Sequence, residues 1–286
     1  MSGATRPVLR YHGGKFRLAP WIMEFFPAHR VYVEPFGGGG SVLIRKPRSH
    51  AEVYNDLDTE IVNLFAVLRD DGHRLREQLE LTPFAREEFD LSYQPCTDPV
   101  EQARRTVVRS FMGFGSAAAS GKKTGFRANS NRSHTTPALD WRNYPAALPY
   151  LIDRLRGGII ENRQAAEVIG QHDSESTLIY ADPPYVLSTR GRMETEVAYG
   201  QYTGYRYEMT DNQHRDLASV LHSAKGMVVL SGYACDLYDK ELYQGWERHE
   251  RQALADGARE RTEVIWINPA CSEALHGAGL FSGVAA

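Results

Sequence analysis

The stretch Val31–Gly40 (VYVEPFGGGG) decides the predicted fold. Its first half is β-branched and aromatic, which is typical of a buried strand, and it runs directly into four glycines. Glycines at that place allow a sharp turn and a close approach of the backbone to a ligand. The next predicted strand, Ala51–Leu57, carries Asp56 near its end, at the distance of about twenty residues where an acid typically binds ribose hydroxyls. The pattern predicts an α/β protein with a nucleoside site at the carboxyl ends of its first strands.

The glycine turn fits a dinucleotide fingerprint poorly. The third glycine of G-x-G-x-x-G would fall on Val42, and nothing in the segment indicates pyrophosphate binding. A glycine turn with acids at two strand ends suits a ligand that has ribose hydroxyls and no phosphate. S-adenosylmethionine is a ligand of that kind. A purely structural glycine turn and an NAD oxidoreductase are the alternatives.

Strand and helix patterns alternate along much of the chain. Strands are predicted at Gly158–Glu161, Thr177–Ala181 and Gly226–Leu230, with a terminal hairpin at Trp246–Arg251 and Thr262–Asn268. Helices are predicted at Ser41–Ile44, Asp58–Asp70 and Thr210–Ala224, the last with a Thr210…Gln213 capping box. This alternation predicts a mostly parallel sheet covered on both faces. Residues 81–149 read instead as a mostly helical insert, and residues 1–80 and 150–286 as the domain that it interrupts.

A second motif, Asp182-Pro183-Pro184-Tyr185, directly follows the apolar strand Thr177–Ala181. An exocyclic amino group on a base is a poor nucleophile because its lone pair is delocalised into the ring. The Asp182 carboxylate and the Pro183 carbonyl can accept from its two N–H bonds and free the lone pair, while the prolines stiffen the loop. Tyr185 offers a ring on which an extruded base can stack. The alternative is a proline-rich turn with a chance acid.

Composition excludes several classes of protein. The chain has 286 residues and only three cysteines, without the spacing of a disulfide framework or a zinc site. It begins without an apolar leader and contains no apolar run long enough to span a membrane. We therefore expect a cytoplasmic protein of a bacterial or phage-infected cell, with no metal and no membrane partner.

Taken together, the motifs resemble those of the Dam-like, D12-class adenine-N6 DNA methyltransferases. Tyr11–Lys15 (YHGGK), Val33–Gly40 (VEPFGGGG) and Asp182–Tyr185 (DPPY) occur in the order that this family uses. The stretches Tyr207–Thr210, Leu230–Tyr233 and Arg261–Pro269 look like those of phage and prophage members. The resemblance covers most of the chain. It implies a class I S-adenosylmethionine-dependent methyltransferase fold, Rossmann-like with a terminal antiparallel hairpin, and a helical target-recognition domain at residues 81–149.

The resemblance also implies roles for individual residues. Tyr11 stands where most relatives have Trp and would pack at the cofactor, Lys15 would contact it, and Asp56 would bind its ribose. Glu34 and the glycine turn would line its methionine part. The expected cofactor-binding residues are Tyr11, Lys15, Glu34, Phe36, Gly37, Gly38, Gly39, Asp56, Asn162 and Asp182, and the expected catalytic residues are Asp182, Pro183, Pro184 and Tyr185. The reaction would be methyl transfer from S-adenosylmethionine to adenine N6 in duplex DNA after base flipping.

The net charge of −3 hides an uneven distribution. Between Gln102 and Arg156 ten basic residues face two acidic ones, a local charge of +8 against −11 for the rest. That asymmetry suits a DNA-facing segment. The expected DNA-binding residues are Lys122, Lys123, Arg127, Asn129, Arg132 and Arg190, and Phe111, Phe114 and Phe126 are expected in the core. The polar loop 188–207, which includes Arg206, is expected to close over DNA or the flipped base.

Other functions compete with this interpretation. C5-cytosine methylation needs a thiolate, and Pro95-Cys96 matches it only superficially because it lies in the insert. N4-cytosine methylation uses the same amino-group chemistry. A catalytically inactive DNA-binding protein with the same fold is a third alternative. A monomer and a homodimer, and a restriction-modification partner or an orphan enzyme, all stay open at this point.

Overall fold

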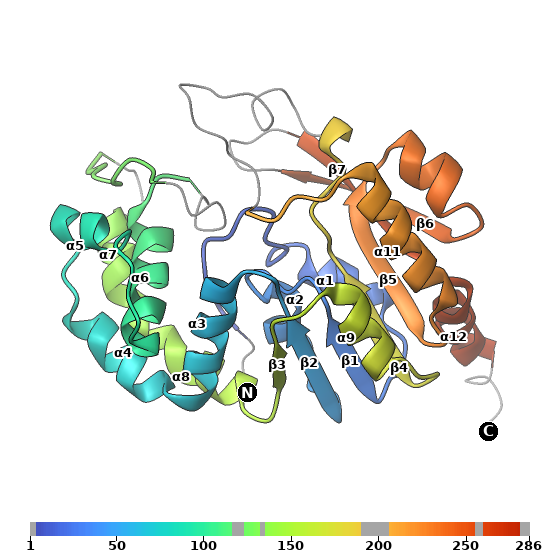
Figure 1. The fold of residues 1–286 in the computed structure, drawn as a ribbon, viewed down its shortest axis with the longest axis horizontal. Helices are drawn as coiled ribbons and strands as arrows, with labels where there is room; N and C mark the ends of the chain where they lie inside the picture. The colour runs from blue at the N-terminus through green and yellow to red at the C-terminus, as the bar shows by residue number, and fades with distance from the viewer. Residues whose placement is uncertain (1–3, 116–122, 132–134, 190–205, 255–259, 281–286) are drawn as a thin grey trace.

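A seven-stranded sheet forms the centre of the computed structural model, which describes residues 4–115, 123–131, 135–189, 206–254 and 260–280 (Figure 1). The strands are β1 (Val31–Glu34), β2 (Ala51–Asn55), β3 (Ile159–Glu161), β4 (Thr177–Ala181), β5 (Met227–Tyr233), β6 (Glu247–Leu254) and β7 (Glu260–Ile267). Their order is β3-β2-β1-β4-β5-β7-β6. Strands β1 to β5 run parallel, and β7 is antiparallel to both β5 and β6. The predicted parallel sheet with a terminal hairpin is confirmed.

Helices connect and cover these strands. They are α1 (Ala19–Ile22), α2 (Ser41–Arg45), α3 (Thr59–Asp70), α4 (Gly72–Leu81), α5 (Arg86–Leu91), α6 (Pro99–Met112), α7 (Pro137–Asn143), α8 (Leu148–Leu155), α9 (Ala165–His172), α11 (Asp211–Ser223) and α12 (Pro269–Leu280). Short 3₁₀ turns occur at η1 (Met23–Phe25), η3 (Pro145–Ala147) and η4 (Leu187–Thr189), and η5 (Leu237–Leu242) is a π-helix. The predicted capping box of α11 is present: Thr210 accepts from the Gln213 amide, and Gln213 accepts from the Thr210 amide.

Alternate residues of each strand bury on opposite faces of the sheet, as the two-residue period of a strand requires. The even-numbered tyrosines Tyr32, Tyr54 and Tyr180 belong to one apolar cluster. Their neighbours Val33 and Ile179 belong to a second cluster, together with residues of α9 and α11. In Figure 1, α9 and α11 lie in front of the sheet and α1 and α2 behind it. Both faces are therefore covered, as the alternation of strands and helices predicts.

The segment from Gly72 to Leu155 contains helices α4 to α8 and, in its described part, no named strand. With α3 it forms the group of helices at the left of Figure 1. Its buried residues, among them Leu75, Val107 and Leu151, share one apolar cluster with α1, α2 and one face of the sheet. The segment is thus packed continuously against the α/β body. Within the described residues, no helix combines the length and the apolar character needed to cross a bilayer.

Candidate active site

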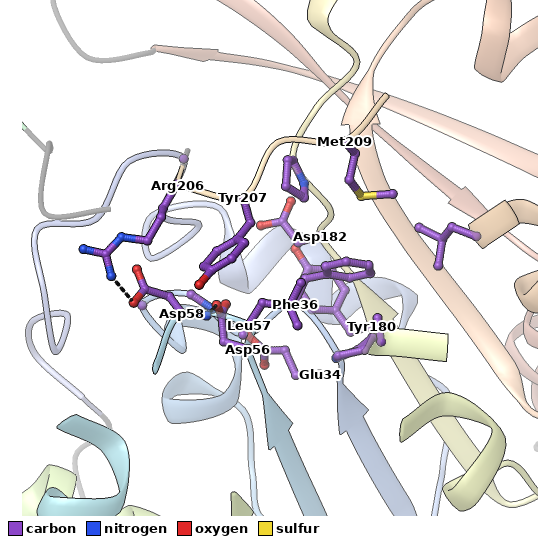
Figure 2. A pocket seen from close by; sticks show the side chains of 18 of the residues that line it. Glu34, Phe36, Asp56, Leu57, Asp58, Tyr180, Asp182, Arg206, Tyr207 and Met209 are labelled. Carbon is purple, nitrogen blue, oxygen red and sulfur yellow. Dashed lines mark hydrogen bonds and ion pairs between the residues drawn. The ribbon is translucent and has the colours of Figure 1, made fainter. Parts of the chain in front are cut away.

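The main cavity lies at the carboxyl ends of β1, β2 and β4 and has a volume of about 530 Å³. At this point the strand order reverses. The chain runs from β1 to β2 and β3 on one side of β1, and it then returns to form β4 and β5 on the other side. Open α/β sheets bind ligands at such a point because the loops diverge and leave a crevice. The cavity walls include Tyr11, Lys15, Phe36 and Asp56, all of which the motifs place at the cofactor. Figure 2 shows Glu34, Asp56 and Asp182 gathered around this cavity.

The glycine turn after β1 is shaped by close packing. Gly38 and Gly40 have φ values of +46° and +59°, a region that residues with a Cβ adopt only at a cost. A Cβ on Gly37 would lie 2.1 Å from the Tyr54 ring, and one on Gly38 would lie 2.7 Å from the Tyr11 ring. The two tyrosines thus leave room only for glycine in this turn. Tyr11 packs against the turn, on the wall of the main cavity.

Asp56 ties the end of β2 to this turn. Its Oδ2 accepts from the Gly38 amide at 2.8 Å, and its Oδ1 accepts from the Asp58 amide at 2.8 Å. Burial raises the pKa of Asp56 to about 6, against the lowering effect of these backbone hydrogen bonds. The carboxylate is therefore held in a fixed orientation on the cavity wall. Hydrogen bonds from a ligand hydroxyl or ammonium would replace those to water that burial removes.

Glu34, the last residue of β1, is a second buried acid of the cavity, and its side chain is 2% exposed. Its Oε2 accepts from the Tyr32 hydroxyl at 2.8 Å and from the Leu43 amide at 3.0 Å. Burial is the main cause that raises its pKa to about 8, and the hydrogen bond from Tyr32 opposes this rise. An acid in this state favours a positively charged ligand, which would stabilise the ionised form.

Asp182 follows β4 directly and faces the same cavity. Its Oδ1 lies 3.2 Å from Nζ of Lys15, whose side chain is 4% exposed and also donates to the Gly13 carbonyl at 2.8 Å. Burial raises the pKa of Asp182, the Lys15 ammonium opposes this effect, and the Glu263 carboxylate adds to it. The first and the last of the three motifs, which are far apart along the chain, thus meet in one ion pair.

Tyr185 lies beside this pair and is only 6% exposed. The Lys15 ammonium lies 4.7 Å from the centre of its ring. The ring of Tyr233 meets it edge to face, with the centroids 4.5 Å apart. The Tyr185 hydroxyl donates to Oε2 of Glu263 at 2.8 Å. Tyr185 is thus held from several sides, and it lies next to Lys15, which lines the main cavity, without being one of the lining residues itself.

The segment 206–209, just before α11, lies over the cavity (Figure 2). Arg206 donates to Oδ1 of Asp58 at 2.9 Å and to Oε1 of Glu60 at 3.2 Å. Tyr207 and Met209 also contribute to the cavity wall. This segment is the described end of the loop expected to close over DNA or the base. Its basic residue Arg206 instead pairs with two acids at the start of α3.

Other predicted cofactor residues occupy different places. Asn162 is not among the residues that line the cavity, but its side chain donates to the backbone carbonyl of Asp56 at 2.7 Å. Gln164 and Ala165, which follow it closely in sequence, do line the cavity. Pro183 is buried and Pro184 lines the cavity. The sequence analysis missed the contributions of Gln164, Ala165, Ala166, Tyr180, Tyr207, Met209, Leu217 and Val220. Most of these are apolar helix or strand residues, which no motif distinguishes from core.

Of the predicted DNA-binding residues, Lys122, Arg132 and Arg190 fall outside the described residues, and Lys123, Arg127 and Asn129 are not among the residues that line the main cavity. Lys123 pairs with Asp90 at 2.6 Å. Arg127 donates through its side chain to the Phe111 carbonyl at 3.0 Å, and Asn129 accepts from the Asn131 amide. A single β-bridge, Gly113 to Phe126, brings the two ends of this loop together.

The expectation for the three phenylalanines is only partly right. Phe111 is 2% exposed, and Phe126 packs against Phe84 and Phe89 with ring centroids 5.1 and 5.7 Å apart. Phe114 is 74% exposed, so its assignment to the core is wrong. It lies between two glycines at the start of the loop, where no neighbouring element covers it.

The local charge of +8 overstates the positive surface of the helical segment. Arg104 pairs with Glu101 and Glu88, and Arg105 pairs with Glu101. Arg109 and Arg154 pair with Glu60 and Glu52, which belong to the α/β body. The acids that pair with these arginines all precede residue 102, so they lie outside residues 102–156, which carry the local charge of +8. The count therefore mixes internal ion pairs with charges that face solvent.

The strand order, the glycine turn and the acids at the strand ends define a class I methyltransferase fold with its site at the switch point of the sheet. The comparison with known families specifies the class further. The family described as D12 class N6 adenine-specific DNA methyltransferase matches residues 11–256, and the chain belongs to this family. The resemblance inferred from the three motifs is confirmed, and the chain is an adenine-specific DNA methyltransferase.

Characterised relatives cover nearly the whole chain at low identity. The type II methyltransferase M1.LlaDCHI of Lactococcus lactis is 26% identical over 92% of this chain and 95% of its own length. The DNA adenine methylase of Haemophilus influenzae is 24% identical over 84% of this chain and 83% of its own. That of Salmonella typhimurium LT2 is 24% identical over 91% and 93%. The matches favour adenine N6 over N4-cytosine, C5-cytosine and inactive alternatives, while the phage or prophage type stays a prediction.

Proposed function

We propose that the methyl donor is S-adenosylmethionine, bound in the main cavity, and that the target adenine is flipped out of duplex DNA to meet it beside Asp182. The observation that carries this proposal is the position of Asp182. Its carboxylate stands at the carboxyl end of β4, on the wall of the main cavity and 3.2 Å from the Lys15 ammonium. A base inside a duplex cannot reach a carboxylate placed in this way, so the base has to leave the stack.

The chemistry of the cavity fits S-adenosylmethionine, which supplies an electrophilic methyl group on a positively charged sulfur. Glu34, Asp56 and Asp182 provide three acids to a ligand that carries a sulfonium and an ammonium. Asp56 would hold the ribose hydroxyls, and Phe36, Leu217 and Val220 provide apolar walls for a nucleobase. None of these contacts requires a phosphate group, which is the difference from a dinucleotide.

Asp182 and the Pro183 carbonyl would act on the amino group of the target. Both are acceptors, and two acceptors on the N–H bonds of N6 draw its lone pair out of conjugation with the ring. N6 becomes positively charged as its bond to the methyl carbon forms and the carbon–sulfur bond breaks. The Asp182 carboxylate stabilises this charge more in the transition state than in the ground state.

Entry of the base requires Lys15 to move. Its ammonium now pairs with one oxygen of Asp182 and lies near the ring of Tyr185. Asp182 and Tyr185 are the two side chains that we propose contact the target base. A cofactor carboxylate near Lys15 would give the ammonium another partner. We therefore expect cofactor binding to favour base entry.

Asp182→Asn is the direct test of the catalytic proposal. The amide keeps the shape of the side chain but lacks its charge, so we expect the single-turnover rate of methyl transfer to adenine-containing DNA to fall at least about a hundredfold. Binding of S-adenosylhomocysteine, measured by calorimetry, should change little. A variant that transfers methyl groups at nearly the wild-type rate would refute the role of Asp182.

We further propose that residues 81–149 form the DNA-recognition part of the molecule. Lys123 lies in the loop that the Gly113–Phe126 bridge closes, and Arg127 and Asn129 directly follow this loop. Phosphate contacts by basic side chains make binding salt-dependent. Lys123→Gln and Arg127→Gln should each reduce the slope of log affinity against log salt by about 1. Lys225→Gln is the matched control, because exposed Lys225 precedes β5 at the opposite end of the strands. Equal slopes for all three variants would refute this assignment.

A further inference from the structure

Glu263 is a buried carboxylate next to the DPPY motif, and none of the sequence motifs assigns it a role. It belongs to β7 of the antiparallel hairpin and pairs in register with Tyr233 of β5. The residue is 8% exposed. Its Oε2 accepts from the Tyr185 hydroxyl at 2.8 Å. A buried carboxylate is costly to desolvate, so a specific partner at this place points to a role beyond packing.

The hydrogen bond acts at the far end of the Tyr185 side chain. A tyrosine ring turns about two side-chain torsions. The hydroxyl oxygen lies on the axis of the second torsion, so the hydrogen bond to Glu263 restricts the first torsion, whereas restriction of the ring plane needs a contact with the ring itself. Tyr233 limits the ring from one side through its edge-to-face contact at 74°. On the motif side, Lys15 lies 4.7 Å from the ring centre, and Lys15 is the group that base entry displaces. The contacts of Tyr185 with Glu263 and Tyr233 do not involve Lys15, so they can hold the ring after Lys15 has moved.

Glu263 also contributes negative charge to the reaction centre. Its carboxylate adds to the rise of the pKa of Asp182, after burial and against the effect of Lys15. The two carboxylates therefore interact across the Tyr185–Lys15 pair. A second fixed negative charge near an amino group that becomes cationic favours the transition state over the ground state.

We propose that Glu263 is a positioning residue for methyl transfer: with Tyr233 it holds the ring of Tyr185 in the orientation on which the flipped adenine stacks, and it adds a second negative charge near the reacting amino group. This inference rests on the proposed roles of Tyr185 and Asp182. It assigns to the C-terminal hairpin a part in the reaction, although the hairpin lies outside the Asp182–Tyr185 motif and follows it by about eighty residues along the chain.

A double-mutant cycle tests the proposal on the full-length protein. The variants are Tyr185→Phe, Glu263→Ala and the two combined, with Glu263→Gln as a variant of nearly equal volume. We expect each single variant to lower the single-turnover rate about tenfold or more. The loss in the double variant should be smaller than the product of the two single losses, because both remove the Tyr185–Glu263 hydrogen bond, while Tyr185→Phe also removes a hydrogen bond to Asp182. Glu263→Gln should recover part of the loss, since its amide oxygen still accepts from Tyr185 but carries no charge.

Base flipping is measured separately by the fluorescence of 2-aminopurine placed at the methylated position. Glu263→Ala and Tyr185→Phe should lower this signal in parallel, while the affinity for S-adenosylhomocysteine stays within about twofold of wild type. Glu250→Gln on β6 is the control, because Glu250 is exposed and pairs with Arg248, and it should behave as wild type. If Glu263→Ala does not fold, the cycle is run with Glu263→Leu and Tyr185→Phe, because leucine keeps much of the side-chain volume but cannot accept from the Tyr185 hydroxyl.

The outcomes separate this proposal from the one on which it rests. Independent, multiplicative rate losses for Tyr185 and Glu263, or a wild-type rate in Glu263→Ala, would overturn the positioning role alone. If Tyr185→Ala left the 2-aminopurine signal unchanged and Asp182→Asn kept its rate, the proposed function itself would fail. Non-additive losses together with a parallel loss of fluorescence would support the role of Glu263.

Discussion

Glu34 and Asp56 are acids that the protein holds in an unfavourable environment. Burial raises the pKa of Glu34 to about 8 and that of Asp56 to about 6, although each accepts hydrogen bonds that favour its charged form. Burial is the largest cause in both cases. For Glu34 the negative charge of Asp182 adds to the effect of burial and exceeds the opposing effect of the Lys46 charge. The missing component is a positive charge, which the proposed cofactor carries.

This imbalance predicts a pH-dependent affinity. Near pH 7 Glu34 is mostly protonated in the free protein, and a cationic ligand stabilises its ionised form, so binding should release protons. The affinity for S-adenosylmethionine should rise with pH between about 6 and 8, by at most about tenfold per unit for one proton. Calorimetric titration in buffers of different ionisation enthalpy measures the released protons directly.

The stability of the free protein should change in the opposite direction. The folded-state pKa of Glu34 is raised, so its stabilising contribution is complete below the unfolded value of 4.5 and is lost as pH rises through about 8. For Asp56 the corresponding loss runs from 3.8 to about 6. Glu34→Gln should remove the pH dependence above pH 6 from both affinity and stability. If the variant keeps the wild-type profile, another group is responsible.

At the scale of elements, the glycine turn joins β1 to α2 and forms part of the cavity wall. Gly40 caps α2 in the left-handed conformation, and Gly38 donates its amide to Asp56. The Tyr54 hydroxyl donates to the Gly38 carbonyl at 2.7 Å. The turn is therefore shaped by side chains of neighbouring elements as much as by its own sequence.

Gly38→Ala should damage this element. The left-handed backbone costs a residue with a Cβ about 1–2 kcal/mol, and the new Cβ would lie 2.7 Å from the Tyr11 ring. We expect a loss of unfolding free energy in urea of about that size, together with weaker binding of S-adenosylhomocysteine. Gly170→Ala in α9 is the control. No atom lies within 4 Å of its added Cβ, so it should stabilise the helix by about 0.5–1 kcal/mol.

At the scale of the whole molecule, the helical segment and the sheet are joined by buried charges. Arg154 of α8 donates to Glu52 of β2, at 2.9 Å for one pair of atoms, and to the Leu43 carbonyl at 2.6 Å. Lys46 donates to the same glutamate at 2.6 Å. These contacts link α8 to β2 and α2 on the face of the sheet that also packs against α3 and α6.

Arg154→Met should therefore weaken the whole fold. Removing one partner leaves Glu52 buried with less compensation, and we expect the unfolding free energy in urea to fall by about 3 kcal/mol. Arg156→Met changes an exposed arginine just after the same helix, so its effect should stay within about 0.5 kcal/mol. Similar losses in both variants would show that the buried pair contributes no more than the surface residue.

Several elements follow from local sequence alone, and they do so for physical reasons. The strand before the glycine turn and the strand before Asp182 lie within two residues of their predicted positions, and the strands of the terminal hairpin within three, because strand propensity and turn chemistry are local. The capping box of α11 is equally local. The placement of Phe114 failed because exposure depends on which elements cover a residue. The charge count misled because the partners of Arg109 and Arg154 are distant in sequence.

By itself, the sequence determined the alternation of strands and helices, the glycine turn, the acids at the strand ends and the family to which the chain belongs. These features depend on residue types at short spacing. Only the tertiary structure decided that Lys15 lies against Asp182 and Tyr185, and that Glu263 holds the Tyr185 hydroxyl. Their positions depend on strand order and register, which bring the start, the middle and the end of the chain together at one edge of the sheet.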